Sequence, residues 1–123
     1  MILVDTSVWI GHFRTADSTL VDLLERGRVL AHPFVTGELA LGNLRNRSLV
    51  LDSLSQMPGA VRARDEEVLA FIEGHRLQGL GVGYVDAHLL ASAKLTAGSE
   101  LWTLDQRLDA LAAKLDIAFS PQA

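Results

Sequence analysis

The sequence contains no cysteine, so disulfide scaffolds, thiolate zinc sites and thiol nucleophiles are all excluded. It also lacks long apolar runs, and none approaches the ~20 residues that a membrane-spanning helix needs. The first residues, MILVDTSVW, carry no basic segment of the kind that opens a signal peptide. We therefore expect a cytoplasmic protein that does not enter a membrane.

Basic residues are in the minority, with 11 Lys and Arg against 15 Asp and Glu, and the formal net charge is -4. Proteins that coat nucleic acids without sequence preference usually carry a basic surface, so this class is disfavoured. An enzyme acting on nucleic acid is compatible, because carboxylates in a metal site are neutralised once the ions bind. The length of 123 residues predicts one domain over residues 1–123.

Apolar patterning and helix punctuation predict strands that alternate with helices. We expect strands at 1–4, 29–31, 100–104 and 117–119. We expect helices at 6–14, 17–27, 33–45, 48–57, 65–77, 85–97 and 105–115. The spacings are too long for hairpins, which favours the α/β class: an αβα sandwich with a short parallel central sheet flanked by helices.

Two carboxylates follow expected strands directly. Asp5 comes after the first apolar strand, and Asp105 follows the strand that contains Trp102. In parallel α/β sheets, ligands bind beyond the carboxyl ends of the strands. The alternatives are structural: Asp5 would cap the next helix, and a capping box from Thr103 would make Asp105 an ordinary first-turn acid.

Glu38 and Asp86 lie at helix positions where a charge is unexpected. Glu38 shares a helix face with Phe34 and Leu41, so we expect it in or beside an apolar stripe. The alternative is a boundary residue or a partner for Arg45. Asp86 shares a face with apolar residues, namely Leu89, Leu90 and Ala93. The alternative for Asp86 is a favourable interaction with the helix dipole.

In this fold the four acids would converge. Two carboxylates ~4 Å apart repel by roughly 4 kcal/mol at an effective dielectric near 20, so a cluster needs protons or cations. Oxygen ligands without Cys select Mg²⁺ or Mn²⁺ over zinc. Such ions support phosphodiester cleavage, so we interpret the cluster as a candidate nuclease site.

Four segments of the chain carry a family resemblance: MILVDTSVWIGHFR, GELALGNLR, GVGYVDAHLLASA and LWTLDQRL. They resemble, in order, the acidic blocks of PIN-domain nucleases, and more narrowly those of the VapC toxins of bacterial type II toxin–antitoxin pairs. By this resemblance Asp5, Glu38, Asp86 and Asp105 match the quartet that holds Mg²⁺ or Mn²⁺. Ser7 and Thr103 match hydroxyl positions beside the first and last acids.

The resemblance implies an endoribonuclease that cleaves cellular RNA such as tRNA or rRNA through a metal-activated water. It also implies a homodimer, inhibition by a VapB antitoxin whose tail covers the site, and DNA binding only through that antitoxin. Excess apolar residues at 34–44 and 49–54 favour a dimer face or an antitoxin groove. Arg14, Arg45 and Arg47 are candidates for contacts with RNA phosphates.

Two rival functions remain open. A phosphoacceptor receiver domain has a similar length, but it would need paired acids after the first strand, where Asp5 stands alone. A PIN-like module that only binds partners would be expected to have lost one or more acids. Gly79, Gly81 and Gly83 do not form a G-x-G-x-x-G motif, so we expect a plain loop there. Among the histidines only His88, two residues from Asp86, is close enough in sequence to approach the site, and we expect it to have a surface or packing role instead.

Overall fold

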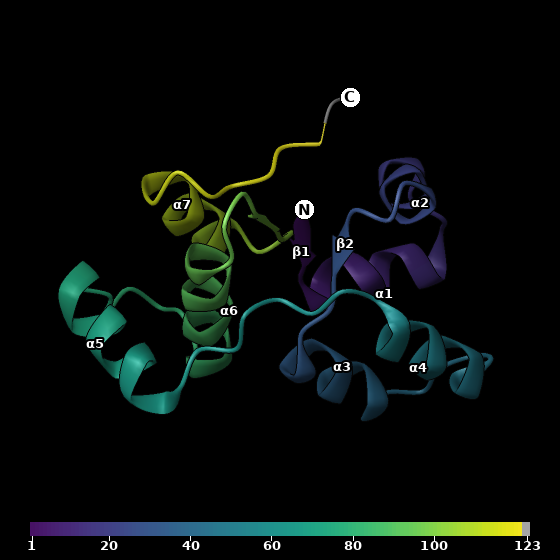
Figure 1. The fold of residues 1–123 in the computed structure, drawn as a ribbon, viewed down its shortest axis with the longest axis horizontal. Helices are drawn as coiled ribbons and strands as arrows, with labels where there is room; N and C mark the ends of the chain where they lie inside the picture. The colour runs from purple at the N-terminus through teal and green to yellow at the C-terminus, as the bar shows by residue number, and fades with distance from the viewer. Residues whose placement is uncertain (122–123) are drawn as a thin grey trace.

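The computed structural model describes residues 1–121. Over that range the chain forms a three-stranded sheet from β1 (Ile2–Val4), β2 (Val29–Leu30) and β3 (Glu100–Trp102). The helices are α1 (Thr6–Arg14), α2 (Ser18–Glu25), α3 (Pro33–Ala40), α4 (Arg47–Gln56), α5 (Asp65–His75), α6 (Tyr84–Leu95) and α7 (Gln106–Lys114). The strands lie between two groups of helices, α1 to α4 on one side and α5 to α7 on the other (Figure 1).

The sheet is parallel and has the order β2-β1-β3. Ile2 pairs with Val29 on one side of β1 and with Glu100 on the other. The chain therefore moves outward from β1 to β2 and later returns to the opposite side of β1 to form β3. This reversal of strand order leaves the carboxyl ends of β1 and β3 side by side, which is where open α/β sheets bind their ligands.

The core is built around β1 and α6. All three residues of β1 are apolar and buried, as a central parallel strand requires. On α6 every residue from position 87 to 93 is buried, so this helix is enclosed on all sides rather than amphipathic. The buried core fixes β1 and β3, after which Asp5 and Asp105 follow, and α6, which carries Asp86. Within the described residues no helix has the length and apolarity needed to cross a membrane.

Several expected elements are one to three residues shorter than their patterns indicated, and two differ more in proportion to their length. The strand expected at 117–119 is reduced to one bridge between Leu101 and Ala118. The helix expected at 33–45 ends at Ala40, and Leu41 is 90 % exposed. Gly42 and Asn43 have low helix propensity, and Asn46 adopts a left-handed conformation with φ 51°, so the chain turns before α4 begins.

Candidate active site

The carboxylate of Asp5 is buried at the end of β1 and held by two hydroxyl groups. Asp5 is 7 % exposed. Its Oδ2 accepts hydrogen bonds from Ser7 Oγ at 2.8 Å and from Thr103 Oγ1 at 2.7 Å. Asp5 occupies the N-cap position of α1, but its side chain forms no capping hydrogen bond. The helix-cap alternative for this side chain is therefore wrong, and Oδ1 accepts no hydrogen bond from residues 1–121.

The same two hydroxyls join the ends of β1 and β3. Ser7 Oγ accepts from the backbone N–H of Leu104 at 3.0 Å, and Thr103 Oγ1 accepts from the N–H of Asp105 at 3.1 Å. The two hydroxyl oxygens are 3.4 Å apart. Each hydroxyl donates to Asp5 and accepts from the chain just after β3, so the separation of Asp5 and Asp105 is set by a short network.

Asp105 is itself the N-cap residue of α7. Its Oδ1 accepts from the N–H groups of Arg107 at 2.9 Å and Leu108 at 3.0 Å. The capping box expected from Thr103 is therefore wrong: the cap lies two residues later, and Thr103 is engaged with Asp5. Asp105 thus combines a structural role at Oδ1 with a position beside the carboxyl end of β3, and Oδ2 takes no part in the cap.

Asp86 lies in the first turn of α6 and is half-buried. Burial raises the pKa of its carboxyl group, and repulsion from the other three acids, Asp5, Asp105 and Glu38, raises it further. A 3.4 Å hydrogen bond from the Gly83 N–H opposes this rise. The net direction of the pKa is upward, because burial and the three neighbouring charges together exceed the effect of the Gly83 hydrogen bond.

Glu38 differs from the expectation of an inward-facing charge. It is exposed on α3, whose buried residues are Val35 and Leu39. The expected apolar stripe depended on a helix continuing through Leu41, which instead lies beyond the helix. Glu38 Oε1 accepts a 2.7 Å hydrogen bond from Thr6 Oγ1 at the start of α1. This contact turns Glu38 towards the end of β1, and within the described range Glu38 forms no ion pair with Arg45.

The donor chemistry of the four acids fits a hard divalent cation, because all the candidate ligands are carboxylate oxygens. Burial and the repulsion from the other three acids both raise the pKa of Asp86, and a bound cation would offset both effects. In the conformation described for residues 1–121, no three His, Asp or Glu side chains are close enough to hold one metal ion together. The acids share a region without being drawn into a closed coordination shell.

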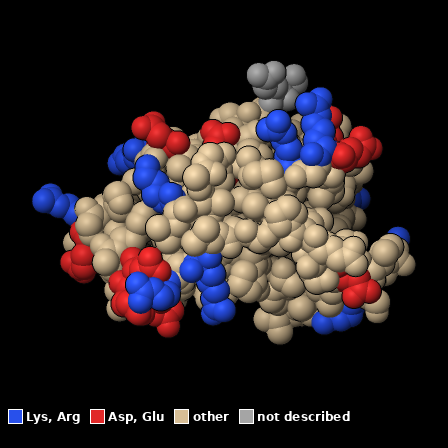
Figure 2. Space-filling model, in the orientation of Figure 1, with Lys and Arg blue, Asp and Glu red and all other residues tan. Residues whose placement is uncertain are grey.

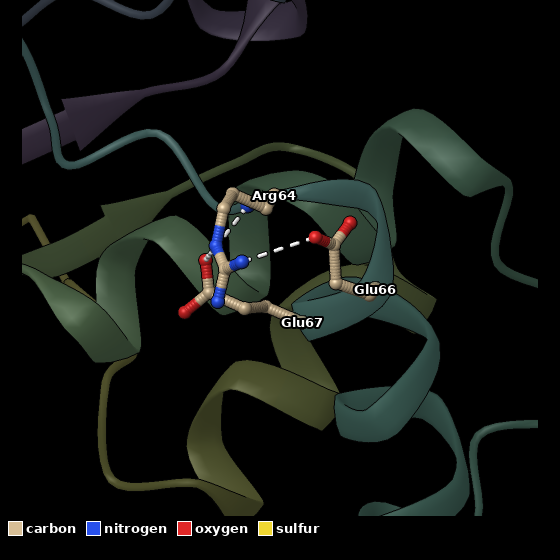
Figure 3. A network of polar contacts seen from close by, with 3 residues as sticks. All are labelled: Arg64, Glu66 and Glu67. Atoms are coloured by element: carbon tan, nitrogen blue, oxygen red, sulfur yellow. Dashed lines mark hydrogen bonds and ion pairs between the residues drawn. The ribbon is translucent and has the colours of Figure 1, made fainter.

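Other acids have structural partners. Glu66 and Glu67 form ion pairs with Arg64 at 3.0 and 3.1 Å, and Glu67 Oε1 also accepts from the Arg64 N–H at 2.9 Å. This network holds the start of α5 and lies on the surface (Figure 3). On the face drawn in Figure 2, charged groups lie mainly around the periphery and the centre is largely uncharged.

Two buried histidines support the helices around the site. His32 caps α3, because its Nδ1 accepts from the Phe34 N–H at 3.0 Å, and its Nε2 lies 3.0 Å from Ser92 Oγ on α6. His88 is buried between the rings of Phe34 and Tyr84, each with a centroid 4.6 Å away. The packing role expected for His88 is therefore confirmed, and both histidines link α3 to α6.

Two of the three candidate RNA-binding arginines lie near Glu38. Arg14 and Arg45 line a groove of about 670 Å³ between α1, α3 and α4, and Glu38 lies in its wall. Arg47 is not among the residues that line the groove, and its Nη1 donates to the Gly42 carbonyl at 3.4 Å. The candidate positive charge is therefore concentrated at Arg14 and Arg45.

Comparison with known proteins identifies the fold family. The PIN domain family model matches residues 2–114. The chain belongs to the PIN-domain family. Ribonuclease VapC32 of Mycobacterium tuberculosis, from strains CDC 1551 / Oshkosh and ATCC 25618 / H37Rv, is 46% identical over 122 residues, covering 99% of this chain and 98% of that protein. The predicted relationship of this PIN domain to the VapC proteins is therefore confirmed.

A solved structure supports the same fold. PAE2754 from Pyrobaculum aerophilum aligns with this PIN domain with a TM-score of 0.58 and 20% identity, covering 94% of this chain and 88% of that one. The receiver-domain interpretation is wrong, because the family match extends over nearly the whole chain.

Sequence reasoning missed two residues of this PIN domain. Thr6 holds Glu38 across 32 positions of sequence, a pairing that no local pattern indicates. Arg107 packs against the loop at Gly81, which leads to Asp86. The available signal was its place two residues after Asp105, at the start of a helix.

Proposed function

We propose that this PIN domain is a Mg²⁺- or Mn²⁺-dependent endoribonuclease and the toxin of a toxin–antitoxin pair. The observation that carries the proposal is the position of Asp5 and Asp105 at the adjoining ends of β1 and β3, joined through the hydroxyl of Thr103. Burial and, to a smaller extent, the charges of Asp5, Asp105 and Glu38 also raise the pKa of Asp86. Three further carboxylates near one half-buried carboxylate are a feature of sites that gather cations. The name of the relative, Ribonuclease VapC32, supports RNA as the substrate.

The proposed ligands of the ion are the carboxylates of Asp5, Glu38, Asp86 and Asp105. A bound divalent ion supplies positive charge that offsets the charge developing on a phosphate during attack by water. The chain contributes fixed orientation. Ser7 and Thr103 hold Oδ2 of Asp5, and Oδ1 accepts no hydrogen bond from the described residues, while the N-terminus of α7 holds Oδ1 of Asp105. Preorganised carboxylates of this kind lose little freedom when they bind a ligand.

RNA is proposed to reach the acids along the groove lined by Arg14 and Arg45. The acids repel phosphate, so cations beside them are needed to hold a polyanion. Arg suits this role because its planar guanidinium donates two hydrogen bonds to one phosphate. By its relationship to the VapC proteins we expect a structured cellular RNA such as tRNA or rRNA, acted on in the cytoplasm.

A VapB-type antitoxin is the proposed inhibitor. The groove between α1, α3 and α4 presents apolar side chains next to Glu38. These groove residues are Ile10, Phe13, Leu39, Leu44, Leu49 and Val50. An antitoxin tail with apolar residues and a basic residue would match both properties, and it would cover the acids. We expect the antitoxin to co-purify when the native operon is expressed, and we expect the toxin to form a homodimer by light scattering.

The test compares RNA cleavage by the purified protein with Mg²⁺, with Mn²⁺ and with EDTA. Wild type should cleave only with metal, and Asp86→Asn should lower the rate about a hundredfold or more while remaining folded. Glu66→Gln is the matched control, because Glu66 is paired with Arg64 on α5, and it should cleave as wild type does. In cells, Asp86→Asn should relieve growth arrest.

Each failure has a distinct meaning. Cleavage that persists in EDTA contradicts the metal dependence. Full activity of Asp86→Asn contradicts the site. A folded wild-type protein that cleaves no RNA with either metal would be a PIN-like module that only binds partners.

A further inference from the structure

Arg107 connects the start of α7 with the loop that leads into α6. It lies in the first turn of α7, and its own N–H donates to Asp105 Oδ1 at 2.9 Å. Its guanidinium extends to Gly81, in the loop that leads into α6. Two residues further along that loop, the Gly83 N–H donates to Asp86 Oδ2. The side chain of Arg107 therefore spans from the cap of α7 to the segment that positions Asp86.

The loop accommodates Arg107 by lacking a side chain at Gly81. A Cβ on Gly81 would clash with Arg107 Nη1 and would lie 3.1 Å from Cζ and 3.2 Å from Cδ. Gly81 also has a φ of +81°, which L-residues rarely adopt. Gly79 in the same loop has a φ of +75°, yet a Cβ there would have no neighbour within 4 Å. Only Gly81 thus combines the backbone requirement with room for the guanidinium.

The guanidinium of Arg107 has no ionic partner among residues 1–121, unlike those of Arg26 and Arg64. Arg26 pairs with Asp22 at 3.1 Å, and Arg64 pairs with two glutamates. In contrast, no carboxylate within residues 1–121 forms an ion pair with the Arg107 guanidinium. Arg107 is also exposed. An exposed guanidinium that lies against Gly81 without an ionic partner among residues 1–121 is available to an anionic ligand.

We propose that Arg107 binds an RNA phosphate next to the scissile one, on the α6/α7 side of the acids. Arg14 and Arg45 lie on the other side, in the groove between α1, α3 and α4. An RNA strand that crosses the acids from this groove would meet cations both before and after the point of cleavage. The inference rests on the proposed ribonuclease function and adds the path of the substrate.

The first experiment measures KM and kcat for cleavage of one single-stranded RNA at constant Mg²⁺ over a series of salt concentrations. Arg107→Ala should raise KM about threefold to tenfold with kcat nearly unchanged. The salt dependence of log(kcat/KM) should lose about 0.7 of its slope, the value for one phosphate contact to a single strand. Arg107→Lys should lie between Arg107→Ala and wild type, and Arg26→Ala should match wild type.

A second pair of variants tests the placement of the guanidinium without removing it. Gly79→Ala and Gly81→Ala impose the same left-handed strain on the loop, but only Gly81→Ala displaces Arg107. Gly81→Ala should therefore raise KM more than Gly79→Ala does. On the Arg107→Ala background this difference between the two glycine variants should disappear.

The inference is overturned if Arg107→Ala keeps the wild-type KM and salt slope, or if it lowers kcat with KM unchanged. It is also overturned if the two glycine variants raise KM equally. If wild type cleaves RNA normally in those cases, the proposed ribonuclease function still stands. If wild type cleaves no RNA, both proposals fall together.

Discussion

The two sides of the candidate site hold their carboxylates in different ways. At the end of β1, Asp5 is buried and receives a hydroxyl hydrogen bond of 2.7 Å from Thr103. On α3, Glu38 is exposed and receives a hydroxyl hydrogen bond of the same length from Thr6. The two threonine hydrogen bonds have the same length, and the two carboxylates differ in burial. The contribution of each contact to stability should therefore be decided by burial rather than by distance.

On the α3 side of the site, the residue that holds the helix in place is not Glu38. His32 begins α3 with a capping contact and reaches Ser92 on α6, and it is only 1 % exposed. The buried imidazole thus connects α3 to α6 by hydrogen bonds, as the Thr103 hydroxyl connects the ends of β1 and β3. Each side of the site therefore has one buried residue that fixes it, His32 or Thr103. The acids beside them differ in exposure.

The largest expected effect is acid destabilisation through His32. Burial, with smaller contributions from His88 and Arg62, lowers the pKa of His32 from 6.5 to about 4. Between these values the unfolded chain binds the proton and the native protein does not, so stability falls as the pH falls from 6.5 to 4. The loss is about 3 kcal/mol. Urea unfolding at a series of pH values measures it.

The control for this prediction is His32→Asn. Its side-chain oxygen can still accept from the Phe34 N–H, but the residue does not titrate. The variant should be less stable than wild type at pH 7, because the Ser92 contact is lost, and its stability should change less between pH 6.5 and 4. An equal pH dependence in both proteins would assign the acid sensitivity to other groups.

The second prediction compares Thr103→Val with Thr6→Val. Valine keeps the shape of threonine and removes the hydroxyl. At position 103 this leaves Asp5 with one donor fewer and the Asp105 N–H without its acceptor, so we expect a loss of about 2 kcal/mol. At position 6 we expect about 0.5 kcal/mol or less, because water replaces an exposed contact. Calorimetry should show Tm falling by about 8 °C and about 2 °C.

Equal losses in the two valine variants would contradict the importance of burial. RNA cleavage adds a separate readout. Thr103→Val should reduce the cleavage rate even at temperatures where the protein is fully folded, because Asp5 loses its fixed orientation.

The sequence predicted that Asp5 and Asp105 lie at the ends of β1 and β3, but it did not predict that Glu38 is exposed on α3. The reason is physical. An apolar strand followed by an acid places Asp5 and Asp105 at strand ends, and parallel pairing brings those ends together without knowledge of any side-chain contact. The face of Glu38 depended on how far a helix continued. Because α3 ends at Ala40, Leu41 lies outside the helix, and the helical spacing does not place Glu38 and Leu41 on one face.

Contacts between distant residues were beyond the sequence patterns. Thr6 meets Glu38 and Arg107 meets Gly81 only because α1 packs against α3 and α7 lies next to the loop before α6. Local capping rules also gave the wrong partner for Thr103, whose hydroxyl bonds Asp5 across 98 positions.

The third prediction concerns the metal-free protein. Burial raises the pKa of Asp86, so folding favours its protonated form and stability falls as the pH rises through that pKa. At neutral pH Asp86→Asn removes a repelled charge and keeps an acceptor for the Gly83 N–H. In EDTA at pH 7 we expect Tm to rise on the order of 3 °C. A lower Tm would show that the helix dipole and the Gly83 contact outweigh the repulsion.

The smallest expected effect is that of Glu38→Gln on the metal-free protein. Glu38 is exposed, and glutamine can still accept from Thr6, so Tm in EDTA should change by about 1 °C or less. The metal-induced shift is the sharper readout. An ion at a hundredfold excess over Kd stabilises the native state by about 2.7 kcal/mol, which raises Tm by about 5–10 °C. Calorimetry with saturating Mn²⁺ for wild type should show a smaller shift for Glu38→Gln, since one carboxylate ligand is missing. If the shift is unchanged, Glu38 serves only as the acceptor for Thr6, and the candidate site consists of Asp5, Asp86 and Asp105.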